Sequence, residues 1–376
     1  MSQRLNVPEV GELVDKTLTE MKRERMLIPN TECYGAAIIA WKHVAMSREC
    51  DDRELAVHRC YELLQEMVAA FYRTTIVAVQ PATEHYNHVL EALTISKNSK
   101  SLFRAQMLLR DLEKAVDEAS AVEGNETVDT DTSKFEWHVS QNRQKQNLAP
   151  DADTYRLVLT AWCNSKSPEK VHAAEELLSH FKTRMEIIRR RSSEESIVNA
   201  ISAFISVCAK ENSNKDDAQK METMLTALRT VETVRELNLT PNSTCYGALL
   251  EACNNLVQNG QDRQRILENV FARAADEGYV DQVVLENFKM AASTYLYAKM
   301  VVAPSQEVEN MKVVPEAWTR NVQGFSVNNR GGRKVLPLTI EGQFAFTKAA
   351  AEYKMRKLRR QSNKKMLQGG RMKSSA

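Results

Sequence analysis

Apolar residues recur every three to four positions along most of the chain, the spacing that places them on one face of an α-helix. The segments come in pairs. In the first of each pair the pattern begins at an aromatic residue: Tyr34, Ile38, Trp41; Tyr86, Leu90, Leu93; Tyr155, Leu159, Trp162. In the second it often begins at a smaller residue: Cys60, Leu63, Leu64, Met67; Ala105, Leu108, Leu109, Leu112; Ala174, Leu177, Leu178, Phe181; Met221, Met224, Leu225, Leu228; Leu267, Val270, Phe271, Ala274. The pattern predicts a series of helical hairpins.

The hairpins are copies of one another. A proline precedes a tyrosine by five residues, and an alanine follows the tyrosine by six: Pro29, Tyr34, Ala40; Pro81, Tyr86, Ala92; Pro150, Tyr155, Ala161; Pro241, Tyr246, Ala252. A degenerate copy places Ile197 and Ala203 at the last two positions, and another begins at Asp281. Proline blocks continuation of a preceding helix, and a polar residue after it can cap the next one.

Repeated hairpins of this kind bury their apolar faces by stacking on their neighbours. The fold expected is therefore all-α, a right-handed α-solenoid of five to six hairpins over residues 28–300. An N-terminal helical cap, 1–27, precedes it, and an irregular basic extension, 301–376, follows it. The chain has only 12 Gly and 9 Pro in 376 residues, and this low content agrees with long helices. The longest insertion, 117–148, lacks periodicity and predicts a loop; its acidic residues are either solvated or ligands of a divalent ion.

The clearest copy begins Pro150-Asp151-x-x-Thr154-Tyr155, continues to Ala161-Trp162 and then reaches Ala174-Glu175-Glu176-Leu177-Leu178. It resembles a pentatricopeptide repeat (PPR), and the resemblance covers roughly residues 28–292. The lengthened repeats are similar to algal, heterokont-type members. The Trp-x-x-Leu-Gly-x-x-Tyr signature of the rival tetratricopeptide repeat is absent. The resemblance implies a non-catalytic adaptor that binds single-stranded RNA in a mitochondrion or plastid, in RNA processing, stability or translation.

The resemblance also implies which residues recognise bases: the residue after the first-helix tyrosine, and the last residue of the repeat. The former are Gly35, Asn87, Arg156, Val198 and Gly247; the latter are Ala82, Asp151, Ser193, Asn242 and Asp281. Only Asn87 with Asp151 matches a family pairing, one that resembles a uracil reader. The two glycines and Val198 offer no side-chain hydrogen bond. Asn87 is either such a reader or a solvated residue at the start of a helix.

Charge is distributed unevenly. Residues 348–376 hold ten Lys or Arg and one Glu, a net charge of +9; since the whole chain carries +2, the preceding residues carry −7. The one dense internal cluster is Lys182, Arg184, Arg189, Arg190 and Arg191. It either contacts phosphates or is a solvated helix end favoured by the helix dipole. A further basic helix over 341–366 contains Lys354, Arg356, Lys357, Arg359 and Arg360. It is a phosphate-binding arm, a nuclear address, a membrane-surface helix or a solvated tail.

Other classes of protein find no support in the sequence. No uncharged stretch reaches the ~20 residues of a bilayer-spanning helix, so no membrane partner is expected. Phosphate-loop, dinucleotide and HExxH motifs are absent, which predicts neither an enzyme nor a cofactor. Without a CxxC, most of the seven cysteines should be core residues: Cys33, Cys163, Cys208, Cys245 and Cys253. Trp41 and Trp162 should also be core. The alternative to RNA binding is a protein-binding scaffold that uses the same groove.

The basic tail generates the first prediction. Deleting residues 348–376 should weaken RNA binding for all sequences alike, because phosphate contacts carry no base information. The dependence of affinity on salt should become shallower, since fewer counterions are released on binding. Filter binding at several salt concentrations measures both quantities. Equal affinity and equal salt dependence with and without the tail would show that it is no RNA-binding arm.

Overall fold

The computed structural model describes residues 7–24, 29–47, 50, 52–74, 79–96, 98–123, 148–211, 215–308 and 311–322. The chain divides into two compact units, 1–241 and 242–376. The boundary falls inside the array expected over 28–300. The division coincides with Pro241, where one of the four clear copies of the repeat begins.

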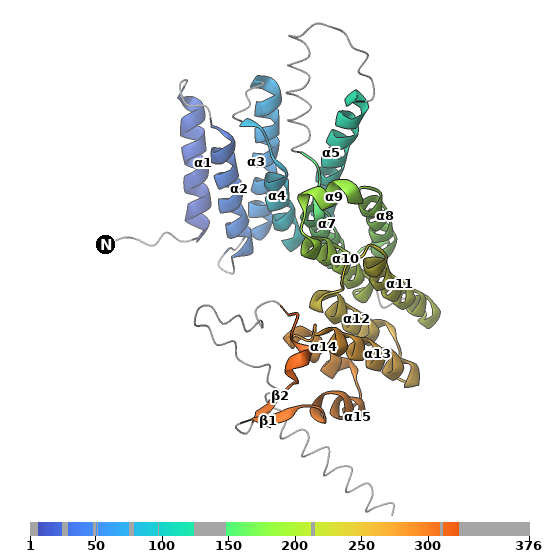
Figure 1. Cartoon of the computed structure of the whole chain (residues 1–376). Helices are drawn as coiled ribbons and strands as arrows, with labels where there is room; N and C mark the ends of the chain where they lie inside the picture. The colour runs from blue at the N-terminus through green and yellow to red at the C-terminus, as the bar shows by residue number, and fades with distance from the viewer. Residues whose placement is uncertain are drawn as a thin grey trace, which may run out of the picture. The chain divides into compact units, whose positions relative to one another are not determined.

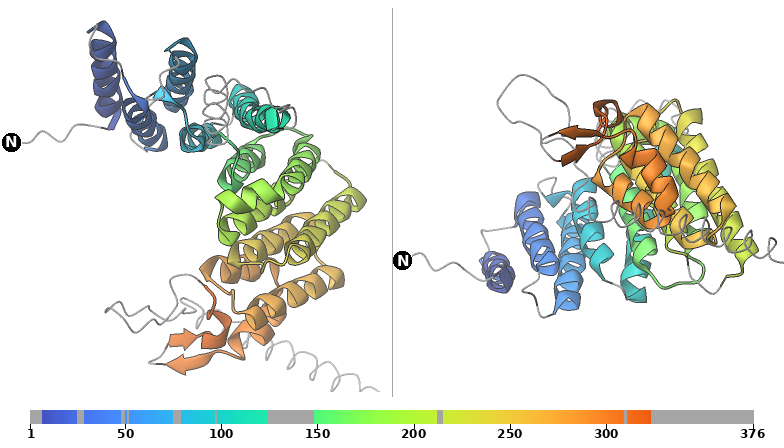
Figure 2. Two further views of the ribbon diagram at one scale, coloured as in Figure 1. Left: turned by 45° about the horizontal axis from the view of Figure 1, so that its top comes forward. Right: turned by 90° about the horizontal axis from the view of Figure 1, so that it is seen from below.

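The regular secondary structure described in the first unit is entirely helical (Figures 1 and 2). Its helices are α1 (Val7–Arg23), α2 (Thr31–Met46), α3 (Arg53–Thr74), α4 (Thr83–Ile95), α5 (Ser99–Glu123), α7 (Ala152–Asn164), α8 (Lys170–Thr183), α9 (Met185–Arg191), α10 (Glu194–Ala209) and α11 (Asp217–Glu236). The helix expected within residues 1–27 is therefore present as α1. The short α9 follows α8 and precedes α10.

The second unit consists of α12 (Ser243–Leu256), α13 (Gln261–Glu277), α14 (Gln282–Ala291) and α15 (Thr294–Tyr297), a π-helical turn (Ala298–Val302), strands β1 (Gln306–Val308) and β2 (Met311–Val313), and a 3₁₀ turn (Glu316–Trp318). The two strands pair antiparallel, with Gln306 opposite Val313. They lie in the segment expected to be irregular. The all-α class is confirmed, and this hairpin of three-residue strands is a small addition to it.

The helices pack in a repeated pattern. In the first unit α2, α4, α7 and α10 each contact the following helix of their own hairpin, α3, α5, α8 and α11. Each of α2, α4 and α7 also contacts the first helix of the next hairpin, α4, α7 and α10. In the second unit α12 contacts both α13 and α14 in the same way. The repeat seen in the sequence is thus a repeat of packing as well.

Tyrosines of the repeat lie in the core, as the periodicity predicts. Tyr155 on α7 is fully buried and packs edge to face against Phe181 of α8, with ring centroids 5.2 Å apart. Its hydroxyl donates a hydrogen bond to Glu113 Oε1 of α5 at 2.8 Å. Tyr246 likewise donates to Glu277. The ring fills the apolar interior while the hydroxyl finds an acceptor, as buried tyrosines require.

Helix starts follow the capping expected from the sequence. The side chains of Asn30, Asp151, Ser193, Asn242 and Asp281 each accept a backbone N–H from the first turn of the helix that follows. Ala82, at the same position before α4, has no side-chain acceptor. Here the ring of His85 reaches back, and its Nδ1 accepts the Ala82 N–H at 3.1 Å.

The expected loop over 117–148 is wrong at its beginning, because α5 continues to Glu123. The segment 117–123 holds two alanines and neither glycine nor proline, so nothing in it stops a helix. The next residue is Gly124, which is unfavourable in a helix interior. The acidic residues expected to bind an ion or water, 123–132, lie almost entirely outside the described residues.

Cysteines and tryptophans mostly occupy the predicted positions. All seven cysteines are free thiols; Cys60, Cys163, Cys208, Cys245 and Cys253 are buried, whereas Cys33 is only half-buried. The expectation that Cys33 belongs to the core is therefore wrong. It lies in the first turn of α2, where a helix end leaves one side open to solvent. Trp41 and Trp162 are buried, 8% and 6% exposed.

Ala174 tests the packing of the hairpin. It is fully buried on α8, a helix that contacts α7 and α10. Ala174→Arg should lower the free energy of unfolding by at least about 3 kcal/mol, because it overfills the contact and buries a charge. Thermal melting followed by circular dichroism measures the loss, with the exposed Ser179→Arg on the same helix as the control. Equal melting of Ala174→Arg and wild type would contradict the packing described.

Candidate nucleic-acid interface

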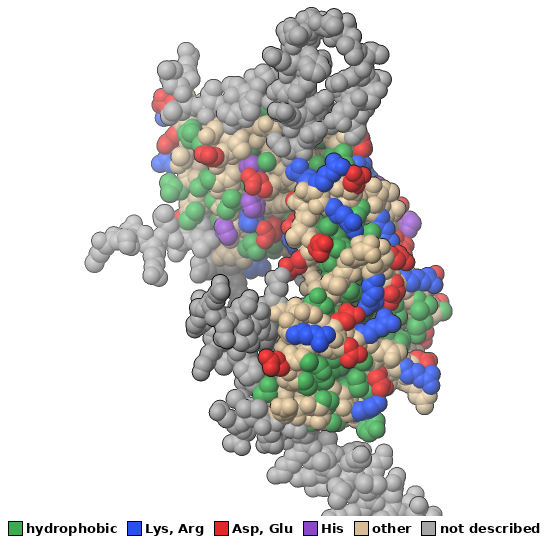
Figure 3. All heavy atoms as spheres, viewed as in Figure 1, with side chains coloured by type: hydrophobic (Ala, Val, Ile, Leu, Met, Phe, Trp, Pro, Cys, Tyr) green, Lys and Arg blue, Asp and Glu red, His purple; other side chains and the backbone are tan. Residues whose placement is uncertain are grey.

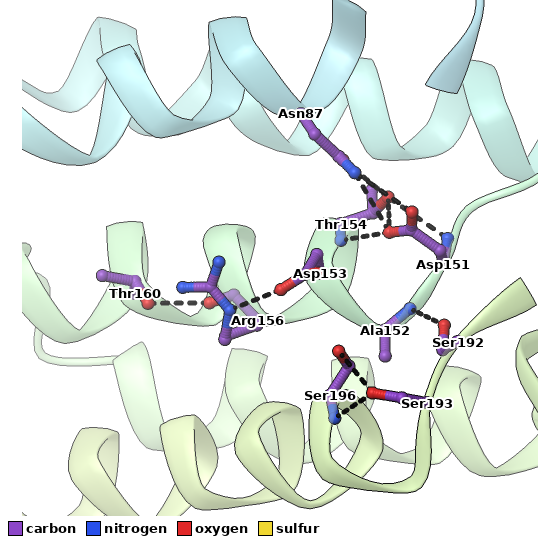
Figure 4. A network of polar contacts seen from close by, with 10 residues as sticks. All are labelled: Asn87, Asp151, Ala152, Asp153, Thr154, Arg156, Thr160, Ser192, Ser193 and Ser196. Carbon is purple, nitrogen blue, oxygen red and sulfur yellow. Dashed lines mark hydrogen bonds and ion pairs between the residues drawn. The ribbon is translucent and has the colours of Figure 1, made fainter. Parts of the chain in front are cut away.

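Asn87 and Asp151 meet where α4 packs against α7. The Asn87 side-chain nitrogen Nδ2 donates to both carboxylate oxygens of Asp151, at 3.1 and 3.2 Å (Figure 4). The two residues are 64 positions apart in the chain. They meet because each stands near the start of a first helix and successive first helices are neighbours. The structure therefore brings together the one pair that matches a family pairing.

Asp151 is held rigidly by its second role. It is the N-cap of α7, and its Oδ1 accepts the backbone N–H of Thr154 at 2.8 Å. In return the backbone N–H of Asp151 donates to the Thr154 hydroxyl at 3.2 Å. This reciprocal pair of hydrogen bonds is a capping box. The carboxylate that faces Asn87 is consequently fixed by the helix itself.

Thr154 completes the network and fixes the orientation of the Asn87 amide. Its hydroxyl oxygen lies 2.8 Å from the amide oxygen Oδ1 of Asn87, and the threonine is completely buried. A carboxylate can only accept hydrogen bonds, so Asp151 must face the amide nitrogen, and the amide oxygen must face the hydroxyl. Asn87 is half-buried. An amide has two N–H groups and two lone pairs on its oxygen. One N–H directed between the two Asp151 oxygens accounts for both contacts, so the second N–H and one lone pair retain capacity for a further bond each.

Arg191 lies beside this pair. A hollow of about 530 Å³ is lined by residues 80–84 at the start of α4, by Asp151 and by Arg191 at the end of α9. The guanidinium of Arg191 donates to the Thr83 hydroxyl at 3.3 Å. The hollow thus holds a cation and two carboxylates, those of Glu84 and Asp151. The sequence showed Arg191 only as the end of a basic run, and showed Thr154 only as part of the repeat motif.

The junction of α2 with α4 is closed by packing. A Cβ at Gly35 would lie only 3.0 Å from the Nε2 of His85, which is itself 4% exposed. The imidazole therefore occupies the space that a base-reading side chain would need. Nearby, Lys42 is held between Glu91 at 2.8 Å and His88 at 3.3 Å.

The junction of α12 with α14 is less tightly packed. A Cβ at Gly247 would make an ordinary van der Waals contact with the Val283 side chain at 3.4 Å, and the Asn287 amide donates to the Gly247 carbonyl at 2.9 Å. Only at Gly35, of these two glycines, would an added side chain be crowded. Val198, the third position without a hydrogen-bonding group, is 3% exposed and belongs to the core.

The remaining predicted readers make local contacts. Arg156 donates to Asp153 at 2.8 Å and is turned toward it in Figure 4. Ser193 accepts the Ser196 N–H as the N-cap of α10. Asn242 accepts the Cys245 N–H as the N-cap of α12. Capping thus engages the side chains of Ser193 and Asn242, as it does that of Asp151.

The dense basic cluster of the sequence is divided among several separate contacts. Arg184 forms two hydrogen bonds with Asp117 of α5, at 2.9 and 3.0 Å. Lys182 and Arg189 donate to Thr233 and to the Leu237 carbonyl, on and just after α11. Arg190 pairs with Glu186 within α9. Neighbours on a helix point in different directions, so a run of basic residues need not form one surface.

Basic and acidic side chains are interspersed over the described residues of the face shown in Figure 3. The Asp117 pKa is lowered, chiefly by its hydrogen bond from Arg184. The basic residues expected in the tail, Lys354, Arg356, Lys357, Arg359 and Arg360, lie outside the described residues. Within the described ranges, no group of three or more His, Cys, Asp or Glu side chains could hold a metal ion. None of the helices described is long and apolar enough to cross a membrane.

No model of a known protein family matches the chain, and no curated protein matches it significantly in sequence. The resemblance to pentatricopeptide repeats therefore depends on the repeated residues themselves.

The closed α2–α4 junction generates a pH prediction. Burial, then the charge of Lys42, lowers the His88 pKa from its ordinary 6.5, although Glu91 opposes the shift. Below pH 6.5 the unfolded chain therefore binds a proton more readily at His88 than the folded chain does. The free energy of unfolding consequently decreases as the pH is lowered. One such group contributes at most about 1.4 kcal/mol per pH unit. Denaturant unfolding between about pH 7 and pH 5 should show that the free energy of unfolding depends less steeply on pH for His88→Gln than for wild type. Identical slopes would contradict the assignment.

Proposed function

We propose that this protein is a non-catalytic, single-stranded RNA-binding adaptor of the pentatricopeptide type, whose hairpins stack as a right-handed α-solenoid. The support for the stacking is the contact of each first helix with the next, at α2–α4, α4–α7, α7–α10 and α12–α14. The proposed ligand is a transcript in a mitochondrion or plastid, where the adaptor acts in RNA processing, stability or translation.

One observation carries the proposal: the Asn87 amide is held in one orientation by Asp151 and Thr154. Single-stranded RNA is recognised mainly by hydrogen bonds to the Watson–Crick edge of unstacked bases. Asp151 and Thr154 occupy the edge on which the amide oxygen and one N–H lie side by side, so the remaining N–H and the remaining lone pair point apart. Uracil presents a group complementary to either one: N3–H for the amide oxygen, or O4 for the amide nitrogen.

The fixed orientation also separates uracil from cytosine. Cytosine in the same position presents N3, an acceptor, to the amide oxygen, or its amino group, a donor, to the amide nitrogen, so whichever contact is made becomes repulsive. A freely rotating amide would turn over and accept either base. Asp151 prevents that rotation because a carboxylate cannot donate a hydrogen bond to the amide oxygen.

Electrostatics limit the extent of the interface. Affinity for nucleic acid ordinarily depends on Lys and Arg that neutralise phosphates. The chain before residue 348 has a net charge of −7, and Arg184 is engaged by Asp117. Arg191 lies in the hollow beside Asp151. We therefore expect a short footprint centred on the α4–α7 junction, with one specified base.

Two variants test the reader. Asn87→Ala should reduce affinity for a uracil-containing oligonucleotide by about 1–3 kcal/mol, the usual value of a base contact. Asp151→Asn should keep the cap of α7 but free the Asn87 amide to turn, which reduces the preference for uracil over cytosine. Competition binding with oligonucleotides that differ at one base measures both effects.

Asn255→Ala, at an exposed position in the second unit, is the matched control and should bind as wild type does. Melting temperatures should show that each variant is folded. A wild-type chain that binds oligonucleotides with no base preference would contradict the reader. A chain with no RNA affinity at low salt would contradict the proposed function and favour the protein-binding scaffold.

A further inference from the structure

A two-residue connector joins α9 to α10 next to the Asn87 network (Figure 4). The connector is Ser192-Ser193, and the surrounding sequence is Arg189-Arg190-Arg191-Ser192-Ser193-Glu194-Glu195. Three consecutive arginines thus stand directly before two hydroxyl groups. Serine kinases with acidic substrate grooves recognise arginines two and three residues before the serine that they modify, by charge-assisted hydrogen bonds to carboxylates.

The two serines differ in accessibility. The Ser192 hydroxyl accepts the backbone N–H of Ala152 at 2.9 Å and is half-buried. Ser193 is exposed, and among the described residues its hydroxyl bonds within the first turn of its own helix, at Ser196. Ser193 is therefore accessible to a modifying enzyme, whereas Ser192 is not.

The arginine at the third position before Ser193 is also accessible. The Arg190 side chain is 74% exposed, and its partner Glu186 is 83% exposed. An exposed pair at this helical spacing contributes little, so an enzyme can displace Glu186 at small cost. The helix that carries Arg190 is only seven residues long and buries two side chains, Met185 and Ile188. Such a segment can open locally without unfolding the unit.

We propose that Ser193 is a phosphorylation site for an arginine-directed serine kinase, and that its phosphate suppresses RNA binding at the Asn87 site. In the reaction the Ser193 oxygen bonds to the γ-phosphorus of ATP. The bond between that phosphorus and the β–γ bridging oxygen breaks, ADP leaves, and the hydroxyl proton passes to the kinase. The product carries about −1.5 to −2 charges at pH 7.

The fold should tolerate this phosphate. Ser193 is the N-cap of α10, and a phosphate there places anionic acceptors against the unpaired N–H groups and the positive end of the helix dipole. The same phosphate should weaken the binding of RNA. The preceding residue is hydrogen-bonded to Ala152, the residue after Asp151, so the new charge is added beside the proposed base site. RNA phosphates approaching that site would be repelled, because charges act over about 8–10 Å at physiological salt.

The test uses the full chain, ATP and the catalytic domain of an arginine-directed kinase, with phosphate located by mass spectrometry. One phosphate on Ser193 is expected. Ser193→Asn should abolish it, while asparagine keeps the cap of α10. Arg190→Ala should slow the reaction at least tenfold, and Ser192→Ala should leave it unchanged. A peptide spanning residues 186–198 is the control for recognition of the sequence. Rapid modification of the peptide with none of the folded chain would overturn the site.

The effect on binding rests on the proposed function and is measured separately. Phosphorylated chain should bind a uracil-containing oligonucleotide at least fivefold more weakly than unmodified chain, with an unchanged melting temperature. Equal affinity would overturn the regulatory role. If unmodified chain binds no RNA, the proposed function and the regulatory role both fail, whereas phosphate on Ser193 of the folded chain would still establish the modification site.

Discussion

The contact between the first helix of one hairpin and the first helix of the next determines which junctions are filled by a side chain and which are bridged by polar groups. Where the facing residue is Gly35, the neighbouring helix supplies the His85 ring, which fills the space. Where α4 meets α7, Asn87 stands opposite Asp151, and two polar groups hold the junction instead. The same packing rule thus produces closed and polar junctions, and the residue after the tyrosine decides between them.

Two buried polar groups of α7 are satisfied by contacts that cross between hairpins. Tyr155 donates to Glu113, and the Thr154 hydroxyl contacts Asn87. Each bond links a residue of α7 to one on α4 or α5, helices of the hairpin before it. Loss of one partner would leave a buried polar group without a hydrogen bond, which costs about 1–3 kcal/mol. These bonds therefore help to fix the register between hairpins, and the register places Asn87 beside Asp151.

Much of the fold, and the central pair of the candidate site, could be predicted from the sequence. Helix positions follow from apolar spacing and from capping residues such as Asn30 and Asn242, because both signals are local. The meeting of Asn87 with Asp151 follows from the repeat, which supplies the register between helices. The position of His85 over Gly35 could not be predicted, because it depends on side-chain directions across helices. The end of α5 could not be placed, because a helical segment of low hydrophobic periodicity resembles a loop in sequence.

The capping of the first helices has a consequence for how such a protein can change its ligand. The position of Asp151 both starts a helix and faces the neighbouring amide, so substitutions there are restricted to residues that do both. Capping favours Asn, Asp, Ser and Thr, so a side chain that contacts the neighbouring amide from that position is drawn from these few residues. Ala82 has no such side chain. His85 caps the helix instead, and the same ring covers Gly35. At that junction, the capping of the helix end and the closure of the space over Gly35 therefore depend on one side chain.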